Sequence, residues 1–264
     1  MFFDGFAILK ARPDISNARR REKEGMSMKI KTILFDLDGT LLPMDQDTFI
    51  KAYFGLLAQR MAPLGYEPAK MIQAVYAGTN AMIGNDGSAS NEAVFWKTFC
   101  AVFGERARED EPHFEAFYHN EFQQVQKACG FDARAARLIK GLREKGYRLV
   151  LATNPLFPAV ATHSRVCWAG MDVRDFEWIT TYENASFCKP NIQYYEEIVR
   201  KLDLDPSQCL MVGNDVGEDM IAGRMGMKTF LLTDCLINRA NEDIQVYPHG
   251  SFEALESYIG ELGK

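Results

Sequence analysis

The sequence predicts an α/β protein with a doubly wound parallel sheet (Rossmann-like) and a second, smaller all-helical domain. Three observations predict it. Five short apolar runs are bounded by turn or acidic residues, helical patterns alternate with them from about residue 132 onward, and a helical block without a strand candidate follows the first run. Continuous apolar runs, without polar alternation, are typical of strands that are covered on both faces.

The expected strands are residues 30–35, 147–152, 178–181, 210–212 and 229–232. Helices are expected between the later strands, at 133–145, 192–202 and 216–225. The first of these carries Leu138, Ile139 and Leu142 at helical spacing and stops at Gly146, a residue type that commonly ends helices. Strand alternating with helix indicates right-handed βαβ units and hence a parallel sheet.

The block between the first two strands is aromatic-rich and reads as helix at 48–61, 68–82, 91–103 and 112–127. We therefore expect a Rossmann-like core of residues 29–46 plus 129–264 and a helical domain of residues 47–128.

Residues 1–28 are expected to form an N-terminal extension, because they hold turn-formers and a charge cluster without a clear period. Met26 and Met28 directly precede the first strand, so we expect the natural start at one of them. The first nine residues are apolar but carry Asp4, and a charged run follows in place of a small-residue cleavage site, unlike a signal peptide.

The composition is that of a soluble globular protein, with 47% hydrophobic residues and a formal net charge of −6. The acidic balance argues against a nucleic-acid or anionic-membrane partner, and no apolar stretch is long enough to span a membrane. The six cysteines are scattered without a C-x-x-C pair, and the four histidines show no zinc-ligand spacing with them. We expect free thiols and a cytoplasmic location.

Residues 36–40 form a D-x-D-G-T motif at the end of the first expected strand. Ligands of doubly wound folds gather at the carboxyl ends of the strands, and the i, i+2 spacing puts Asp36 and Asp38 on one side of the chain. Gly39 permits the tight turn that follows. This motif resembles that of the haloacid dehalogenase superfamily.

Three later motifs follow in that family's order. Thr153 and Asn154 end the second strand. The resemblance implies that the hydroxyl and nearby backbone N–H groups there bind a phosphate oxygen. A helix N-cap at either residue is the alternative, and the two roles can hold at once. Lys189, before a proline and a helical run, is similar to the family's lysine. The acidic motif after the fourth strand departs from the usual pattern, with Asn214 at the first acidic position and Asp215 next.

Charge balance indicates a divalent cation. Like charges gathered in one crevice need counter-charge to remain ionised. Lys189 supplies one positive charge, and Mg²⁺, a hard cation that suits carboxylate oxygens, supplies two more. The carboxylates concerned are Asp36, Asp38, Asp215 and Asp219.

The resemblance implies a Mg²⁺-dependent phosphomonoester hydrolase that acts on a small phosphorylated metabolite. Asp36 is the expected nucleophile, Asp38 the general acid and base, and Lys189 the third catalytic residue. The expected metal ligands are Asp36, the Asp38 backbone carbonyl and Asp215, with Asp219 either a further ligand or the partner of Lys189. The expected substrate-binding residues are Thr153, Asn154 and Gly39.

In this family a helical block at this position is a cap over the active site. The loop at residues 84–87, with Asn91 and Lys97, is expected either to reach inward or to be a solvated turn. Phe95, Trp96 and Phe99 are expected in the cap core in preference to a substrate-stacking platform.

Alternative functions remain at this level. Asp38 argues against carbon–halogen cleavage, because dehalogenases of the family lack this second aspartate. A phosphomutase would keep the same residues, and a non-catalytic domain that binds a phosphorylated ligand or a partner protein is the alternative from a different class. The sequence indicates no particular protein partner.

Overall fold

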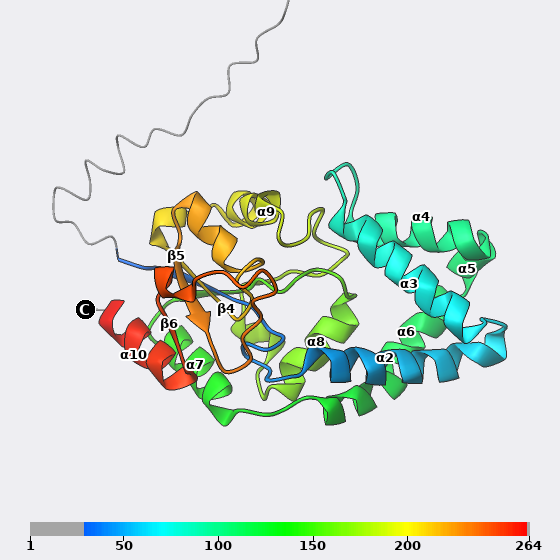
Figure 1. Ribbon diagram of the computed structural model, residues 1–264, viewed down its shortest axis with the longest axis horizontal. Helices are drawn as coiled ribbons and strands as arrows, with labels where there is room; N and C mark the ends of the chain where they lie inside the picture. The colour runs from blue at the N-terminus through cyan, green and yellow to red at the C-terminus, as the bar shows by residue number, and fades with distance from the viewer. Residues whose placement is uncertain (1–28, 263–264) are drawn as a thin grey trace, which may run out of the picture.

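The computed structural model of the 264-residue chain describes residues 29–262 (Figure 1). The expected N-terminal extension and the expected start at Met26 or Met28 lie outside the described residues.

Six parallel strands form one sheet in the order β3-β2-β1-β4-β5-β6. This confirms the predicted doubly wound parallel sheet, and β6 is a strand that the sequence did not predict. The strands are β1 (Thr32–Phe35), β2 (Arg148–Leu151), β3 (Trp178–Ile179), β4 (Cys209–Gly213), β5 (Lys228–Leu232) and β6 (His249–Gly250).

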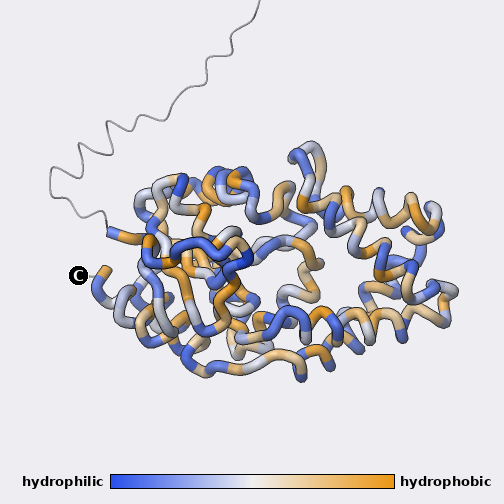
Figure 2. The backbone as a smooth tube through the Cα atoms, viewed as in Figure 1, coloured by the Kyte–Doolittle hydropathy of each residue, from blue (hydrophilic) through white to orange (hydrophobic). Residues whose placement is uncertain are grey.

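Strand β1 is buried on both faces, and its successive side chains alternate between two apolar clusters. Ile33 and Phe35 join one apolar cluster, together with side chains of α7 (Ala133–Glu144), α8 (Ala159–Trp168) and α10 (Phe252–Leu262). Leu34 points to the opposite face and joins a second cluster with side chains of α9 (Ile192–Leu202). The strands accordingly appear mostly hydrophobic in the middle of the core (Figure 2).

The strand order reverses at β1. The chain builds β2 and β3 on one side of β1 and then crosses back to place β4, β5 and β6 on the other. In open parallel sheets, ligands bind at the carboxyl ends of the strands beside such a reversal. A ligand site is therefore expected between the carboxyl ends of β1 and β4.

The elements between β1 and α7 are all helical and lie to one side of the sheet (Figure 1). The two ends of this block meet, since Met44 and Cys129 form a bridge and the Gly130 N–H donates to the Pro43 carbonyl at 2.7 Å. The exact division at residues 47 and 128 stays a prediction. The block comprises α2 (Gln46–Met61), η1 (Ala62–Leu64), α3 (Pro68–Ile83), α4 (Asn91–Phe103), α5 (Arg106–Glu109), α6 (Glu111–His119) and η2 (Glu121–Ala128).

Two predicted helices are wrong in detail. The predicted helix 112–127 is interrupted at Asn120, whose φ of −115° and ψ of −85° are not helical, so α6 and η2 are separate. The predicted helix 216–225 shortens to η5 (Met220–Met225). Its first residues form a turn because the Asp215 carboxylate accepts hydrogen bonds from the N–H groups of Gly217 and Glu218.

Helices α8 and α10 were not predicted from the sequence, and neither were the short turns η3 (Val173–Asp175), η4 (Pro206–Gln208) and η6 (Ile244–Val246). In the described part of the chain, each helix is too short or too polar to cross a bilayer. All six cysteines are free thiols, as expected.

Candidate active site

Asp36 and Lys189 form a buried ion pair at the carboxyl end of the sheet. Asp36 follows β1, and its N–H continues the ladder by donating to the Val212 carbonyl of β4 at 2.9 Å. The Lys189 Nζ lies 2.9 Å from Asp36 Oδ1 and 2.6 Å from Asp219 Oδ1, and the lysine is only 1% exposed. Three separate segments of the chain therefore meet at one ammonium group, as the sequence predicted.

The ion pair keeps Lys189 charged. Burial by itself lowers the Lys189 pKa, but the nearby carboxylates of Asp219 and Asp36 outweigh it and hold the pKa well above its usual range. Burial raises the pKa of Asp219 to about 7, against the lowering effect of Lys189. At neutral pH the site therefore holds a permanent positive charge beside the Asp36 carboxylate.

The turn after β1 requires glycine at position 39. Gly39 has a φ of +86°, and its N–H donates to the Leu42 carbonyl at 2.8 Å. A Cβ atom there would lie 2.3 Å from the Asn214 Nδ2. Thr40 holds the Asn214 side chain in place, because the Thr40 hydroxyl donates to Asn214 Oδ1 at 2.9 Å. Gly39 thus allows the turn to approach the acidic motif. It does not line the pocket of about 230 Å³ that opens at this edge of the sheet.

Asp38 pairs with a residue that the sequence analysis missed. The Arg165 guanidinium, on α8, contacts Asp38 Oδ2 and is 1% exposed, whereas Asp38 Oδ1 is buried without a hydrogen-bond partner. Arg165 is itself held by the Thr162 hydroxyl at 3.2 Å and lies 4.5 Å from the Phe157 ring centre. Burial raises the pKa of Asp38, and Arg165 opposes this. No motif in the sequence marks Arg165.

Asp215 pairs with a second arginine that the sequence analysis missed. The Arg239 Nη1 lies 2.6 Å from Asp215 Oδ2, and its Nη2 lies 3.1 Å from the Gln46 Oε1 of α2. Asp215 Oδ1 accepts from the N–H groups of Gly217 and Glu218 at 2.9 and 3.0 Å. Arg239 therefore joins the acidic motif to the helical block.

Asn154 links the second and third motifs. Its Oδ1 accepts from the Lys189 N–H at 3.3 Å, and its Nδ2 donates to Glu218 Oε2 at 3.0 Å. The Thr153 carbonyl accepts from the Thr180 hydroxyl at 2.6 Å, which fixes the chain at the end of β2. The alternative of a helix N-cap at Thr153 or Asn154 is wrong, because the following helix α8 has Pro158 at its N-cap.

A pocket of about 230 Å³ opens at this edge of the sheet. Predicted site residues from three of the four motifs line it, and Lys189 lies directly behind Asp36. The helical block closes one side through Gln46, Phe49 and Ile50. The predicted residues in the wall are Asp36, Asp38, Thr153, Asn154, Asp215 and Asp219.

The site offers oxygen donors suited to a hard divalent cation. Within residues 29–262, no group of three or more His, Cys, Asp or Glu side chains is already arranged around a metal position. Asp36 and Asp215 nevertheless face one pocket, and each is now paired with a cationic side chain. Each of these two carboxylates therefore sits where a positive charge is favourable. Mg²⁺ fits such a place, because it prefers one or two carboxylates together with water and phosphate oxygens. Asp219 has both oxygens engaged, one by Lys189 and one by the Asp215 N–H at 3.0 Å.

The loop at residues 84–87 reaches the core. Its Asn85 is buried and donates to Asn91 Oδ1 at 2.9 Å, while Asn91 Nδ2 lies 3.3 Å from the Cys188 Sγ, next to Lys189 in the chain. A Cβ atom on Gly87 would lie 2.2 Å from the Phe187 ring. Gly84 and Asp86 are nevertheless exposed, and none of residues 84–87 lines the active-site pocket, so the loop is buried only in part and the solvated-turn alternative holds for these two residues. Lys97 is also exposed. It lines neither the active-site pocket nor a second cavity of about 380 Å³ beside that pocket.

The aromatic residues of α4 divide between core and cavity. Phe99 is fully buried in the apolar cluster, as predicted. Trp96 belongs to that cluster and Phe95 packs against it, but both also line a larger cavity between the helical block and residues 156–160 and 182–183. The prediction that all three residues belong to the core is thus incomplete for Phe95 and Trp96.

Comparisons with known proteins agree with this geometry. The family model of haloacid dehalogenase-like hydrolases matches residues 30–226. A glyceraldehyde 3-phosphate phosphatase of Methanothermobacter thermautotrophicus is 28% identical over 228 residues, covering 82% of this chain and 91% of the relative. A pyrophosphatase PpaX of Anoxybacillus flavithermus is 28% identical over 203 residues, covering 76% and 83%.

Solved structures share the fold. A haloacid dehalogenase phosphatase from Thermococcus onnurineus superposes with a TM-score of 0.54 at 17% identity, covering 88% of this chain and 98% of that one. The hydrolase YfnB from Bacillus subtilis, bound to magnesium, gives a TM-score of 0.51 at 18% identity, covering 89% and 100%. The expected enzyme class, a phosphatase of this type, is confirmed. The chain belongs to the haloacid dehalogenase-like hydrolase family.

Proposed function

We propose that the protein is a Mg²⁺-dependent phosphomonoester hydrolase that cleaves a small phosphorylated metabolite in the cytoplasm through an aspartyl-phosphate on Asp36. One observation carries the proposal: the Asp36 carboxylate lies 2.9 Å from a fully buried ammonium and faces the same pocket as Asp38. Such an arrangement suits attack on a dianionic phosphate, because the nucleophile and the counter-charge are already in place.

The reaction takes two steps at the same phosphorus. In the first, a carboxylate oxygen of Asp36 bonds to phosphorus as the ester P–O bond breaks, and protonated Asp38 gives its proton to the leaving alkoxide. In the second, Asp38 takes a proton from the water that attacks the aspartyl-phosphate, which releases phosphate and restores Asp36. Burial raises the Asp38 pKa, which favours the protonated form that the first step needs.

Other residues bind and orient the phosphate. Lys189, fixed between Asp36 and Asp219, neutralises charge near the equatorial oxygens. The Thr153 hydroxyl and the backbone N–H groups near Asn154 are the proposed donors to those oxygens. The N–H groups of residues 39–42 already donate to carbonyls of their own turn, so the proposed role of Gly39 is to shape that turn beside the phosphate.

The proposed Mg²⁺ ligands are the carboxylates of Asp36 and Asp215 and the backbone carbonyl of Asp38. The bound cation would reduce repulsion between these groups and the incoming phosphate. Asp219 we assign to Lys189, because its two oxygens already accept from the Lys189 ammonium and the Asp215 N–H.

The test compares the wild type with the Asp36→Asn variant on p-nitrophenyl phosphate, with Mg²⁺ and with EDTA. The wild type should release phosphate only with the metal, and Asp36→Asn should abolish turnover. The matched control is Asp205→Asn, an exposed aspartate that precedes β4 at the opposite edge of the sheet. Near-normal rates in Asp36→Asn would overturn the proposal.

Two other outcomes would assign a different function. Bisphosphate-dependent isomerisation without phosphate release would indicate a phosphomutase. Tight phosphate binding without hydrolysis would indicate a binding domain.

The aspartyl-phosphate itself can be detected in acid-quenched single turnovers with an ester that is radiolabelled at phosphorus. The label should remain on the wild-type protein and be absent from Asp36→Asn.

A further inference from the structure

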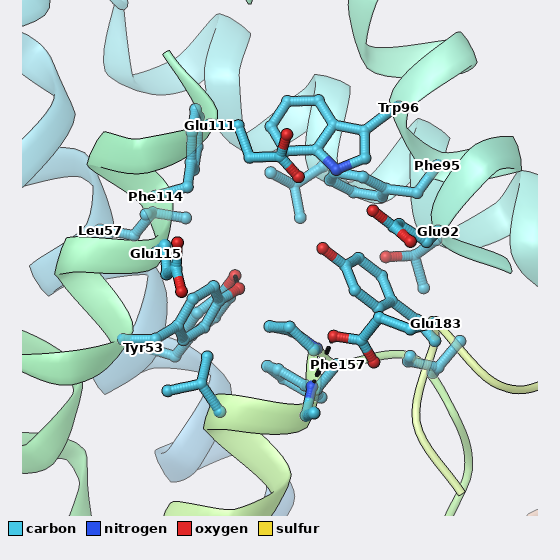
Figure 3. Close-up of a pocket in the computed structure, with 18 of the residues that line it drawn as sticks. Tyr53, Leu57, Glu92, Phe95, Trp96, Glu111, Phe114, Glu115, Phe157 and Glu183 are labelled. Carbon is cyan, nitrogen blue, oxygen red and sulfur yellow. Dashed lines mark hydrogen bonds between the residues drawn. The ribbon is translucent and has the colours of Figure 1, made fainter. Parts of the chain in front are cut away.

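A second cavity, of about 380 Å³, lies between the helical block and the core segments 156–160 and 182–183, next to the active-site pocket (Figure 3). Ile50, Leu156 and Phe157 line both spaces, so the cavity begins where the active-site pocket ends. A substrate whose phosphate lies at Asp36 would therefore place its leaving alcohol toward this cavity.

The walls of the cavity are largely aromatic. Tyr53, Phe95, Trp96, Phe114 and Phe157 surround the open centre (Figure 3). Several of these rings pack edge to face, for example Trp96 on Phe114 with ring centres 5.6 Å apart and Tyr53 on Phe157 at 5.4 Å. Such packing fixes ring orientation, so the walls are preformed before a ligand arrives.

Four carboxylates are placed around the same space, and they come from α4, from α6 and from the loop after β3. Figure 3 shows the side chains of Glu92, Glu111, Glu115 and Glu183 around the opening. No lysine or arginine is among the described residues that line the cavity. Burial raises the pKa of Glu111, and the charges of Glu92 and Glu115 add to this against Arg108, so the carboxylates act on one another.

The nearest cations compensate this charge only in part. Arg108 lies behind the wall, 4.9 Å from the Trp96 ring centre, and pairs with Glu92 at 3.4 Å and Glu111 at 3.3 Å. Four carboxylates against this one guanidinium leave three formal negative charges. His119, 3.9 Å from Glu115, adds charge only when protonated. The cavity is therefore negative as well as aromatic.

One wall of the cavity also holds an indole N–H that lacks a well-aligned acceptor in the described part of the chain. The Trp96 indole Nε1 is buried, has no partner of good hydrogen-bond geometry among residues 29–262, and faces the cavity (Figure 3). The neighbouring polar group is the Tyr182 hydroxyl; burial raises the pKa of that phenol, and the indole opposes the rise. A buried donor without a good partner costs stability, which a ligand oxygen in the cavity would recover.

We propose that this cavity binds a cationic, largely apolar leaving group, so that the substrate is a phosphate monoester of an alcohol with a quaternary or protonated amine. Aromatic faces attract such cations, and a desolvated site strengthens the attraction. Carboxylates add to it at short range, while a leaving group with its own negative charge would be repelled. The assignment rests on the proposed function, because it places the phosphate at Asp36.

The test uses two esters of the same shape that differ only in charge. Choline phosphate carries a quaternary nitrogen, and 3,3-dimethylbutyl phosphate has a carbon atom in its place. The wild type should show a kcat/KM at least about tenfold higher for choline phosphate. The advantage should decline with rising salt, because the partly exposed carboxylates are screened.

Substitution of the cavity carboxylates tests whether the preference for choline phosphate arises in the cavity. Glu92→Gln and Glu115→Gln should each lower the ratio of the two kcat/KM values about threefold. Glu256→Gln, on the exposed face of α10 outside the cavity, is the matched control and should keep the wild-type ratio. Equal kcat/KM values for the two esters, or equal ratios in all the variants, would overturn the inference.

Hydrolysis of p-nitrophenyl phosphate separates the two failures. The leaving group of this aryl ester carries no positive charge. If the ester is cleaved with Mg²⁺ but choline phosphate has no advantage over 3,3-dimethylbutyl phosphate, only the preference for a cationic leaving group is disproved. If none of the esters is hydrolysed, the proposed function itself is disproved. Calorimetric titration of choline into the protein then tests whether the cavity binds a cationic group. Absence of binding would overturn the inference too.

Discussion

The Arg165 guanidinium contacts the Asp38 carboxylate and so joins α8 to the turn after β1. The arginine is 1% exposed and lies over the Phe157 ring, which leaves it little freedom to move away. Asp38 therefore experiences two opposed influences. Burial raises its pKa and favours the acid, whereas the adjacent cation lowers the pKa and favours the carboxylate. Their balance sets the pH range in which Asp38 can act as an acid.

Replacement of Arg165 by methionine should shift the pH profile of the enzyme. Without the guanidinium the Asp38 pKa rises further, so the acid stays protonated to higher pH. The alkaline limb of kcat/KM, which follows loss of that proton, should move upward, and kcat should fall about tenfold or more because Asp38 loses its orientation. Steady-state kinetics across pH measures both effects.

The matched control for Arg165 is Arg174→Met, since Arg174 is a mostly exposed arginine whose carboxylate partner, Asp172, lies outside the site. It should leave the profile unchanged. A thermal melt of Arg165→Met separates misfolding from the kinetic effect. A folded variant with an unchanged alkaline limb would show that Arg165 does not tune Asp38.

Removal of Lys189 should destabilise the fold in a pH-dependent way. Lys189→Met leaves Asp36 and Asp219 buried without their cation, which should cost about 3–5 kcal/mol of unfolding free energy at neutral pH and above. Lys189 lowers the Asp219 pKa, so the variant raises it above about 7. A carboxyl group with a raised folded pKa destabilises in its ionised form, and the cost should shrink as pH falls through that pKa and Asp219 is protonated.

Urea unfolding at about pH 8 and about pH 5 measures this difference. Lys140→Met, an exposed lysine on α7, is the control and should be near neutral at both pH values. A destabilisation of Lys189→Met that is the same at both pH values would contradict the argument, because packing loss alone does not titrate.

Gly39 should be sensitive for two separable reasons. Gly39→Ala places a Cβ atom in a left-handed backbone conformation and 2.3 Å from the Asn214 amide. The backbone cost is about 1–2 kcal/mol, and the contact should also displace Asn214 and lower kcat. Gly226→Ala has nearly the same φ, +88°, but open space around the new Cβ, so it should show the backbone cost with unchanged kcat. Chemical denaturation and phosphate-release assays on both variants separate the two effects.

The sequence predicted the parts of the site that follow strand ends. Asp36 and Asp215 each follow a buried parallel strand, and neighbouring strands of such a sheet place their carboxyl ends together. Lys189 was found by its motif in the family order. These residues are placed by local sequence and by rules that hold for the whole fold class.

Arg165 and Arg239 were missed because tertiary packing alone brings them to the site. Arg165 is on an unpredicted helix that packs against the sheet, and Arg239 is on a loop that folds back over Asp215. The dual role of Trp96 was missed for a related reason. A wall of a cavity and a core position show the same apolar spacing along a helix, and only the arrangement of α4 against α6 and the 156–160 segment distinguishes them.

Arg239 should compete with the metal for Asp215. Its Nη1 lies 2.6 Å from Asp215 Oδ2, and the carboxylate has its other oxygen engaged by two backbone N–H groups. A divalent cation at Asp215 must displace or share this partner. Arg239→Gln should therefore tighten Mg²⁺ binding about threefold, a modest change because the guanidinium is 64% exposed and its ion pair is screened by water.

Calorimetric titration of Mg²⁺ into the substrate-free protein measures this affinity independently of turnover. Arg224→Gln, an exposed arginine on η5 near the same motif, controls for the loss of one positive charge and should bind Mg²⁺ as the wild type does. An unchanged Mg²⁺ affinity together with a raised KM for phosphate esters would assign Arg239 to the substrate. Because the same arginine also donates to Gln46 of α2, a metal that displaces Arg239 from Asp215 would also change the contact between the acidic motif and the helical block.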